Sequence, residues 1–275
     1  HKAGFTPAGK NEVQERGQYL VEGAAHCAAC HSPRNALMAQ DGVQVGDKAF
    51  LTGGVVDGWN APSLRGPQSA PQKWSIEEMA SYLATGRNSH STANGEMGLA
   101  VEQSFQHLTD ADTLAIAAFL KGIDGAAVEV PESFAVKAPT ALPAAPADAA
   151  GEETAKMLTE ASPNMPVGAR LYLDNCAACH FVTGKGAPGI FPELAANDLV
   201  TGSEVKPLVS IILHGAEVPS TEKRPMRLVM QGYADRLTDD EVAQLATFVR
   251  SAWGNKAGAV SATDVAKVRN QASTH

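Results

Sequence analysis

Apolar residues recur at helical spacing in four stretches of the chain, and these stretches form two similar pairs. Residues 11–23 and 108–123 make the first pair, and residues 166–175 and 237–254 make the second. No stretch alternates apolar and polar residues over the length of a strand. The pattern therefore predicts an all-α fold.

The later helix of each pair carries recognisable end signals. Thr109 is the expected N-cap of the first, with Asp110 and Asp112 in an acidic first turn. Thr238 and Glu241 predict a capping box at the start of the second. The apolar faces that the two helices would bury contain Leu114, Ala117, Ala118 and Leu120 in the first, and Val242, Leu245, Phe248, Val249 and Trp253 in the second.

The two pairs of helices predict two domains, at residues 1–130 and 163–275. Residues 131–162 are the predicted linker, because the stretch 136–153 is rich in Pro and Ala and has no helical period. The piece after Gly254 is polar and weakly patterned, so we expect a tail that lies over the surface of the second domain.

Composition narrows the function classes. The chain has 275 residues, of which 44% are hydrophobic but only 5% aromatic. Two domains with so few rings have thin cores, to which a bound apolar cofactor would add buried surface. The formal net charge of −8 argues against a nucleic-acid partner, which needs a basic face.

The chain shows no membrane-spanning pattern. No stretch approaches the roughly 18 apolar residues that a membrane helix requires. It begins at His1, and we expect a processed or trimmed form from which a signal peptide is no longer visible.

One short motif occurs twice and uses every cysteine of the chain. Cys-Ala-Ala-Cys-His stands at residues 27–31 and again at residues 176–180, each time after a predicted helix. A Cys-x-x-Cys pair occurs in disulfide redox sites, in zinc sites, in local disulfides and in sites of covalently attached haem.

The sequence context favours haem. A thioredoxin-like redox site needs alternating strands and helices, which the pattern does not predict. A four-ligand zinc site needs two Cys pairs close together, whereas these pairs lie in separate halves. Residues three apart share one face of a helical turn, so both sulfurs of a motif can reach one porphyrin. The adjacent histidine, His31 or His180, can then place its imidazole under the iron.

A haem iron with one histidine has an open face, and a second side chain closes it in electron-transfer proteins. In the first half Met97 lies in a Gly-containing segment before the last helix, with His90 and His107 as rivals. In the second half Met230 has the matching place, with Met226 as its rival. The matching places favour Met97 and Met230, although methionine is more commonly core filler.

Each half also contains a Pro-x-Leu segment that could orient the histidine. A proline carbonyl, from Pro62 in the first half and Pro192 in the second, is suited to accept a hydrogen bond from the histidine Nδ1. Pro188 competes in the second half. Trp59 and Arg65 flank the first segment and are candidates for binding the haem propionates, with ordinary core packing as the alternative for Trp59.

Four longer stretches carry a resemblance to a known family. They are RGQYLVEGAAHCAACHSPRNALM, LTGGVVDGWNAPSLRG, LATGRNSHSTANGEMGLAVEQSFQHLTDADTLAIAAFLKGI and GARLYLDNCAACHFVTGKGAPGIFPELA. Over most of both halves the chain resembles the cytochrome c subunits of bacterial membrane-bound alcohol, gluconate and related dehydrogenases, and it departs from them in the linker. Those subunits usually carry three haem domains, and this chain resembles the second and third.

The resemblance implies two tandem class I cytochrome c domains joined by a Pro/Ala-rich linker, with two covalently bound haem c groups. It places methionine sixth ligands at Met97 and Met230, in agreement with the loops. It also implies periplasmic maturation.

We therefore expect a periplasmic electron carrier, not an enzyme, that takes electrons from a dehydrogenase and passes them to a quinone, a cytochrome or a terminal oxidase. Association with a membrane would be peripheral, through partner subunits. The alternatives are a di-haem enzyme such as a cytochrome c peroxidase and a haem ligand-binding sensor, each of which needs an open iron face. A thiosulfate-oxidising di-haem cytochrome needs a cysteine as an iron ligand. The two motifs use all four cysteines of the chain, so no cysteine remains for that role.

Overall fold

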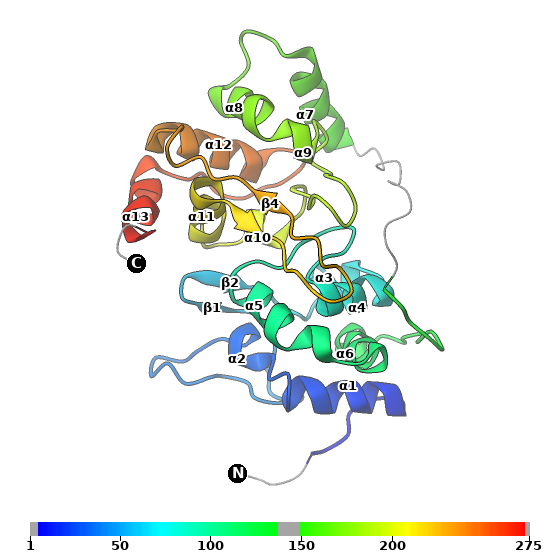
Figure 1. Cartoon of the computed structure of the whole chain (residues 1–275). Helices are drawn as coiled ribbons and strands as arrows, with labels where there is room; N and C mark the ends of the chain where they lie inside the picture. The colour runs from blue at the N-terminus through cyan, green and yellow to red at the C-terminus, as the bar shows by residue number, and fades with distance from the viewer. Residues whose placement is uncertain (1–4, 137–148, 273–275) are drawn as a thin grey trace. The chain divides into compact units, whose positions relative to one another are not determined.

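The computed structural model describes residues 5–136 and 149–272. Helices dominate it, which confirms the prediction of a mostly helical fold (Figure 1). No helix in this described part is long and apolar enough to cross a membrane.

The chain divides into two compact units. The first contains the described residues up to 88, residues 95–136 and the short segment 219–226. The second contains residues 89–94, the described residues from 149 to 218, and residues 227–272. Most of each unit agrees with one predicted domain, but two short segments group with the opposite half. The tandem arrangement and the exact domain limits stay predictions.

The elements of the first unit are α1 (Glu12–Glu22), α2 (Ala28–His31), β1 (Gly54–Val56), β2 (Trp59–Ala61), α3 (Ala70–Lys73), α4 (Ile76–Thr85), α5 (Gly95–Gln103), the 3₁₀ turn η1 (Phe105–His107) and α6 (Asp110–Gly122). Asn11 caps α1 and Thr109 caps α6, each through a side-chain oxygen that accepts a backbone N–H of the first turn. The N-cap prediction for Thr109 is confirmed. α1 packs on α6, and α6 also packs on α4.

The elements of the second unit are α7 (Ala149–Glu160), α8 (Val167–Asn175), α9 (Ala177–His180), α10 (Asp198–Thr201), α11 (Lys206–His214), β3 (Ala216–Glu217), β4 (Val229–Met230), α12 (Asp239–Ser251) and α13 (Ala262–Ala272). α8 packs on α12, as α1 packs on α6 in the first unit. The capping box of Thr238 and Glu241 is present, as predicted.

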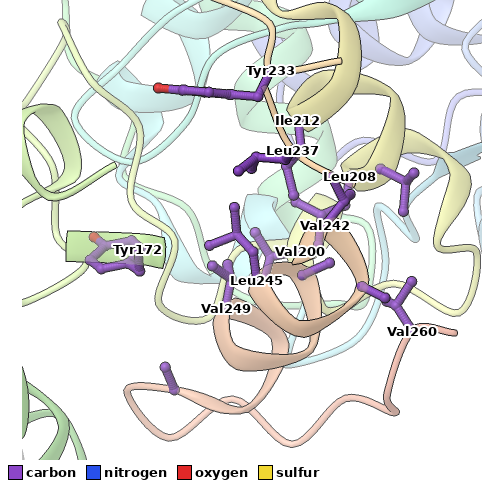
Figure 2. Packing of buried hydrophobic residues seen from close by; sticks show 14 of the residues in the cluster. Tyr172, Val200, Leu208, Ile212, Tyr233, Leu237, Val242, Leu245, Val249 and Val260 are labelled. Carbon is purple, nitrogen blue, oxygen red and sulfur yellow. The ribbon is translucent and has the colours of Figure 1, made fainter. Parts of the chain in front are cut away.

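Helix α12 supplies much of the core of the second unit. Figure 2 shows Val242, Leu245 and Val249 of this helix among residues of α11 and of the loops around it. Burial of such side chains contributes about 1.5–3 kcal/mol each relative to exposure. This core fixes α12, whose C-terminal end leads to the functional site.

The expectation of no strands is wrong in two places. β1 and β2 form a hairpin across Asp57 and Gly58, both of which have positive φ (51° and 77°). Asp-Gly is a strong signal for this type of turn, but strands of three residues are too short to show alternation. β3 and β4 pair over two residues each, with Ala216 opposite Met230.

Two segments expected to be irregular contain helices. α7 begins inside the predicted linker, because Pro does not occur after residue 146 there and strong helix formers follow. Its Leu158 is only 1% exposed and belongs to the core. The rest of the linker, residues 137–148, lies outside the described residues. The prediction of a polar surface tail after Gly254 is also wrong, because this segment contains α13, which buries Val265 and Val268.

Candidate haem sites

Each Cys-Ala-Ala-Cys-His motif forms a single helical turn. The turns are α2 and α9, with Cys27 and Cys176 at their N-caps and the histidine as their last residue. In both turns, the backbone N–H of the histidine donates to the backbone carbonyl of the first cysteine, at 2.9 Å for His31 and 3.0 Å for His180. The two cysteines of a turn are three residues apart and therefore share one face. This is the spacing that one porphyrin requires.

The two histidines are held by the same pair of main-chain contacts. The carbonyl of His31 accepts from Gly53 N at 2.7 Å, and that of His180 accepts from Gly186 N at 3.2 Å. The Nδ1 of His31 lies 2.7 Å from the carbonyl oxygen of Pro62. The Nδ1 of His180 lies 3.0 Å from that of Pro192. The second histidine thus faces Pro192 and not Pro188, which lies inside a tight turn between Ala187 and Phe191.

These contacts define the state of each imidazole. A carbonyl only accepts, so Nδ1 carries the proton and Nε2 keeps its lone pair in the neutral ring. Burial lowers the pKa of both His31 and His180, and the proline carbonyls oppose this only in part. Each histidine is therefore a neutral, oriented imidazole whose Nε2 is suited to bind a metal.

Three of the four cysteines do not have the properties of reactive thiolates. None of the four forms a disulfide, and burial raises the pKa of Cys27 and of Cys176 to about 12. Burial also raises the pKa of Cys30. Disulfide exchange and zinc binding use the thiolate, which such values disfavour. Within the described residues, no cluster of three or more His, Cys, Asp or Glu side chains could hold a metal ion. The donor set thus fits haem better than zinc.

Met97 lies in the first turn of α5 and not in a loop, as its Gly-rich surroundings had suggested. The neighbouring Glu96 is close enough to Cys30 to raise its pKa further. The indole ring of Trp59 packs on the backbone of Gly95, where an added Cβ would lie 3.1 Å from the ring. The start of α5 is thereby held near the first motif and its Pro62 loop. The ligand role of Met97 stays a prediction.

Met230 is half-buried in β4 and packs against the core of the second unit. His180 belongs to the same unit. Its rival Met226 is 70% exposed and groups with the first unit. These placements favour Met230, whose ligand role also stays a prediction.

The rivals of Met97 lie elsewhere. His90 groups with the second unit, where its Nδ1 is 3.4 Å from Glu193 Oε2. His107 ends the turn η1, just before the N-cap of α6.

Arg65 has a protein partner. Its Nε lies 2.9 Å from Asp124 Oδ1, just beyond the end of α6. This pair ties the Pro62 loop to the last helix. Binding of propionates by Arg65 and Trp59 stays a prediction.

Sequence reasoning missed two glycines that bring helices together beside the motifs. An added Cβ at Gly17 of α1 would lie 2.6 Å from the carbonyl carbon of Ala115 in α6. At Gly168 of α8 it would lie 2.8 Å from that of Gln244 in α12. Glycine inside an amphipathic helix costs about 1 kcal/mol relative to alanine, and its recurrence in both halves was the available signal.

An aromatic cluster under the second motif was also missed. Tyr172 donates to the carbonyl of Phe181 at 2.6 Å, one residue after His180. Trp253 Nε1 donates to the carbonyl of Val182 at 2.9 Å, and its ring lies 5.0 Å from that of Tyr172. The rings hold the segment that follows the motif.

Comparison with known proteins agrees with this geometry. The family model for cytochrome c matches residues 14–124 and again residues 167–253, and each match includes one motif. The chain belongs to the cytochrome c family. Membership implies covalently bound haem c, and the resemblance drawn from the sequence is confirmed.

Several cytochrome c relatives match nearly the whole chain. The cytochrome c subunit of the quinone alcohol dehydrogenase of Gluconacetobacter polyoxogenes is 37% identical over 97% of this chain and 55% of its own length. The cytochrome c subunit of gluconate 2-dehydrogenase of Pantoea cypripedii is 35% identical over 96% of this chain and 58% of its own length. A diheme cytochrome c-type protein of Cereibacter sphaeroides is 40% identical over 40% of this chain and 35% of its own length. The chain thus spans little more than half the length of these two dehydrogenase subunits.

Proposed function

We propose that this chain is a periplasmic two-haem c-type cytochrome built from two tandem domains. It carries electrons from a dehydrogenase to a quinone, another cytochrome or a terminal oxidase. One observation carries the proposal: the same frame occurs twice, with two cysteines on one face and a neutral histidine bound to a proline carbonyl.

The protein residues bind and orient the cofactor. Cys27 and Cys30 hold one haem through thioether bonds, and Cys176 and Cys179 hold the other. His31 and His180 would bind the irons through Nε2, and Met97 and Met230 would supply the remaining ligands. When bound, haem supplies the one-electron chemistry. A methionine ligand would favour the reduced iron and would leave no coordination site for a substrate.

The relatives support the donor side. Those with the longest matches are named as cytochrome subunits of dehydrogenases, so we assign a dehydrogenase as the electron donor. Association with the membrane is then peripheral, through the partner subunits. The acceptor follows from the chemistry alone: it must accept single electrons.

Mass spectrometry of the denatured chain, expressed with a cytochrome c maturation system in the periplasm, tests the cofactor. We expect the mass of two haems, retained after acid–acetone extraction. A chain with no retained haem, or with one, would contradict the proposal.

Absorption spectra distinguish the carrier from the alternatives. The oxidised protein should show the weak far-red band of methionine-ligated iron, and the reduced protein should not bind carbon monoxide. Carbon monoxide binding at neutral pH would instead favour a peroxidase or a ligand sensor.

A further inference from the structure

In the second unit, a buried amide just beyond α12 contacts the loop that supports the histidine. Asn255 follows Trp253 and Gly254, which turn the chain with positive φ (52° and 83°) after α12. The residue is only 7% exposed. Buried amides need partners for both their oxygen and their nitrogen.

All the hydrogen bonds of this amide go to main-chain atoms. Oδ1 accepts from Ala196 N at 2.8 Å, and Nδ2 donates to the carbonyl of Leu194 at 3.0 Å. Nδ2 also donates to the carbonyl of Val249 at 2.9 Å, within α12 itself. A C-cap role would need only the last of these. The other two bonds join α12 to the loop that begins at Pro192.

That loop positions the proximal histidine. Pro192, whose carbonyl accepts from His180 Nδ1, lies two residues before Leu194. Leu194 N donates to the carbonyl of Gly184, which closes the loop on itself at 2.8 Å. Asn255 is thus the side chain that anchors this closed loop to the core helix.

The first unit has a group at the matching place, with different chemistry. Asp124 lies just beyond α6, and its carboxylate accepts from Arg65 Nε at 2.9 Å and from Gly66 N at 2.6 Å. The Pro62 carbonyl, bound to His31 Nδ1, lies three residues before Arg65. The side chains of Arg65 and Asp124 are 28% and 33% exposed, so solvent and salt reach this pair.

We infer that Asn255 and Asp124 are positioning residues, each of which holds a proline carbonyl against the Nδ1 of a proximal histidine. We call each set of contacts a clamp. The clamp of the second unit, Asn255 with Ala196 and Leu194, is neutral and buried. The clamp of the first unit, Asp124 with Arg65 and Gly66, is ionic and accessible to salt. The inference rests on the proposed function. It implies that a neutral clamp influences the reduction potential of one haem and an ionic clamp that of the other.

The expected effect follows from ligand basicity. A hydrogen bond from Nδ1 to an acceptor raises the basicity of the imidazole, and a more basic ligand favours the oxidised iron. Loosening a clamp weakens this bond, so the reduction potential of that haem should rise. The other haem should not change, because its own clamp is intact.

The test compares three variants of the full holoprotein by spectroelectrochemical titration. Asn255→Ala should raise one of the two potentials, and Asp124→Ala should raise the other. Thr247→Val is the matched control, because Thr247 Oγ1 accepts from Val260 N at 2.9 Å on the same helix without touching the Pro192 loop. It should lower the melting temperature and leave both potentials unchanged.

Two further measurements exclude a merely structural role. Exchange of the His180 Nδ1 proton with solvent, followed by NMR in the reduced state, should become faster in Asn255→Ala and not in Thr247→Val. Added salt should shift only the potential that Asp124→Ala shifts. Where Asn255→Ala does not fold, Asn255→Asp replaces it, because a carboxylate keeps the acceptor for Ala196 N and cannot donate to Leu194.

The outcomes separate the inference from the function on which it rests. A variant protein with two attached haems, both potentials unchanged and an unchanged Nδ1 exchange rate would overturn the inference. If both clamp variants shift the same potential, the assignment of one clamp to each haem is wrong. A wild-type chain without covalent haem would overturn the proposed function instead.

Discussion

Replacing Gly168 by alanine should separate α8, which leads into the second motif, from α12. The added Cβ would overlap the carbonyl oxygen of Gln244 and lie 2.8 Å from its carbon and 2.9 Å from Phe248 Cβ. The carbonyl belongs to the backbone of α12 and cannot rotate away, so α8 must move. Because α8 ends at Asn175, directly before Cys176, the movement reaches the site.

The magnitude follows from two opposing terms. Overpacking of this kind costs up to about 3 kcal/mol. Replacing glycine by alanine in a helix returns about 1 kcal/mol. The net loss should be about 2 kcal/mol in the free energy of unfolding, which lowers the melting temperature by roughly 8 °C for a unit of this size.

Thermal unfolding of the holoprotein, followed by far-ultraviolet circular dichroism, measures the effect. Gly258→Ala is the matched control, since an added Cβ there meets no atom within 4 Å and its φ is not positive. That variant should melt within about 2 °C of wild type. If Gly168→Ala melts as high as wild type or higher, helix propensity has decided the outcome and the close crossing of α8 and α12 is refuted.

Three further predictions concern the ligands, an ion pair and the aromatic cluster. Met97→Ala and Met230→Ala should each abolish the far-red methionine band of one haem and lower its potential, because thioether ligation favours the reduced iron; a variant that keeps the full band would show that its methionine is not a ligand. Arg16 lowers the pKa of Asp112 and joins α1 to α6, so Arg16→Met should cost less than about 1 kcal/mol near pH 7. The lowered pKa means that this contribution is present above the unfolded value of about 3.9 and is lost as the pH falls through the folded value, so urea titrations of the variant and wild type should converge in acid. Tyr172→Phe removes the hydrogen bond to the Phe181 carbonyl and should cost about 1 kcal/mol in urea unfolding, with the exposed Tyr19→Phe in the other unit as a comparison; an unchanged midpoint would mean that this bond contributes nothing.

The sequence predicted the features that are local. Helical periodicity and caps identified α1, α6, α8 and α12, because apolar faces and capping side chains act within a few residues. The duplicated motif and the two Pro-x-Leu segments were likewise found, since each is a pattern of a few adjacent residues.

The features that the sequence did not reveal are contacts between distant segments. Asn255 reads as an ordinary polar residue after a helix, and its role depends on Leu194, about 60 residues before it. Gly17 and Gly168 look unfavourable for their helices until the partner helix is present. The flanking glycines of Met97 predicted a loop, but Met97 lies in helix α5. The first residue of this helix, Gly95, packs against the ring of Trp59, which is 36 residues earlier in the sequence.

The two halves also show how little the connecting loop constrains the site. His31 and Pro62 are 31 residues apart, whereas His180 and Pro192 are 12 apart, yet both pairs make the same hydrogen bond. The difference in loop-closure entropy is only about 0.8 kcal/mol, because that cost grows with the logarithm of length. A single buried hydrogen bond, such as one of those of Asn255, offsets about that much. The extra residues of the first half, which include the β1–β2 hairpin, are therefore compatible with an unchanged histidine frame. What the two units share is the position of the proline carbonyl, and in each unit a side chain beyond α6 or α12, Asp124 or Asn255, binds the residues that follow that proline.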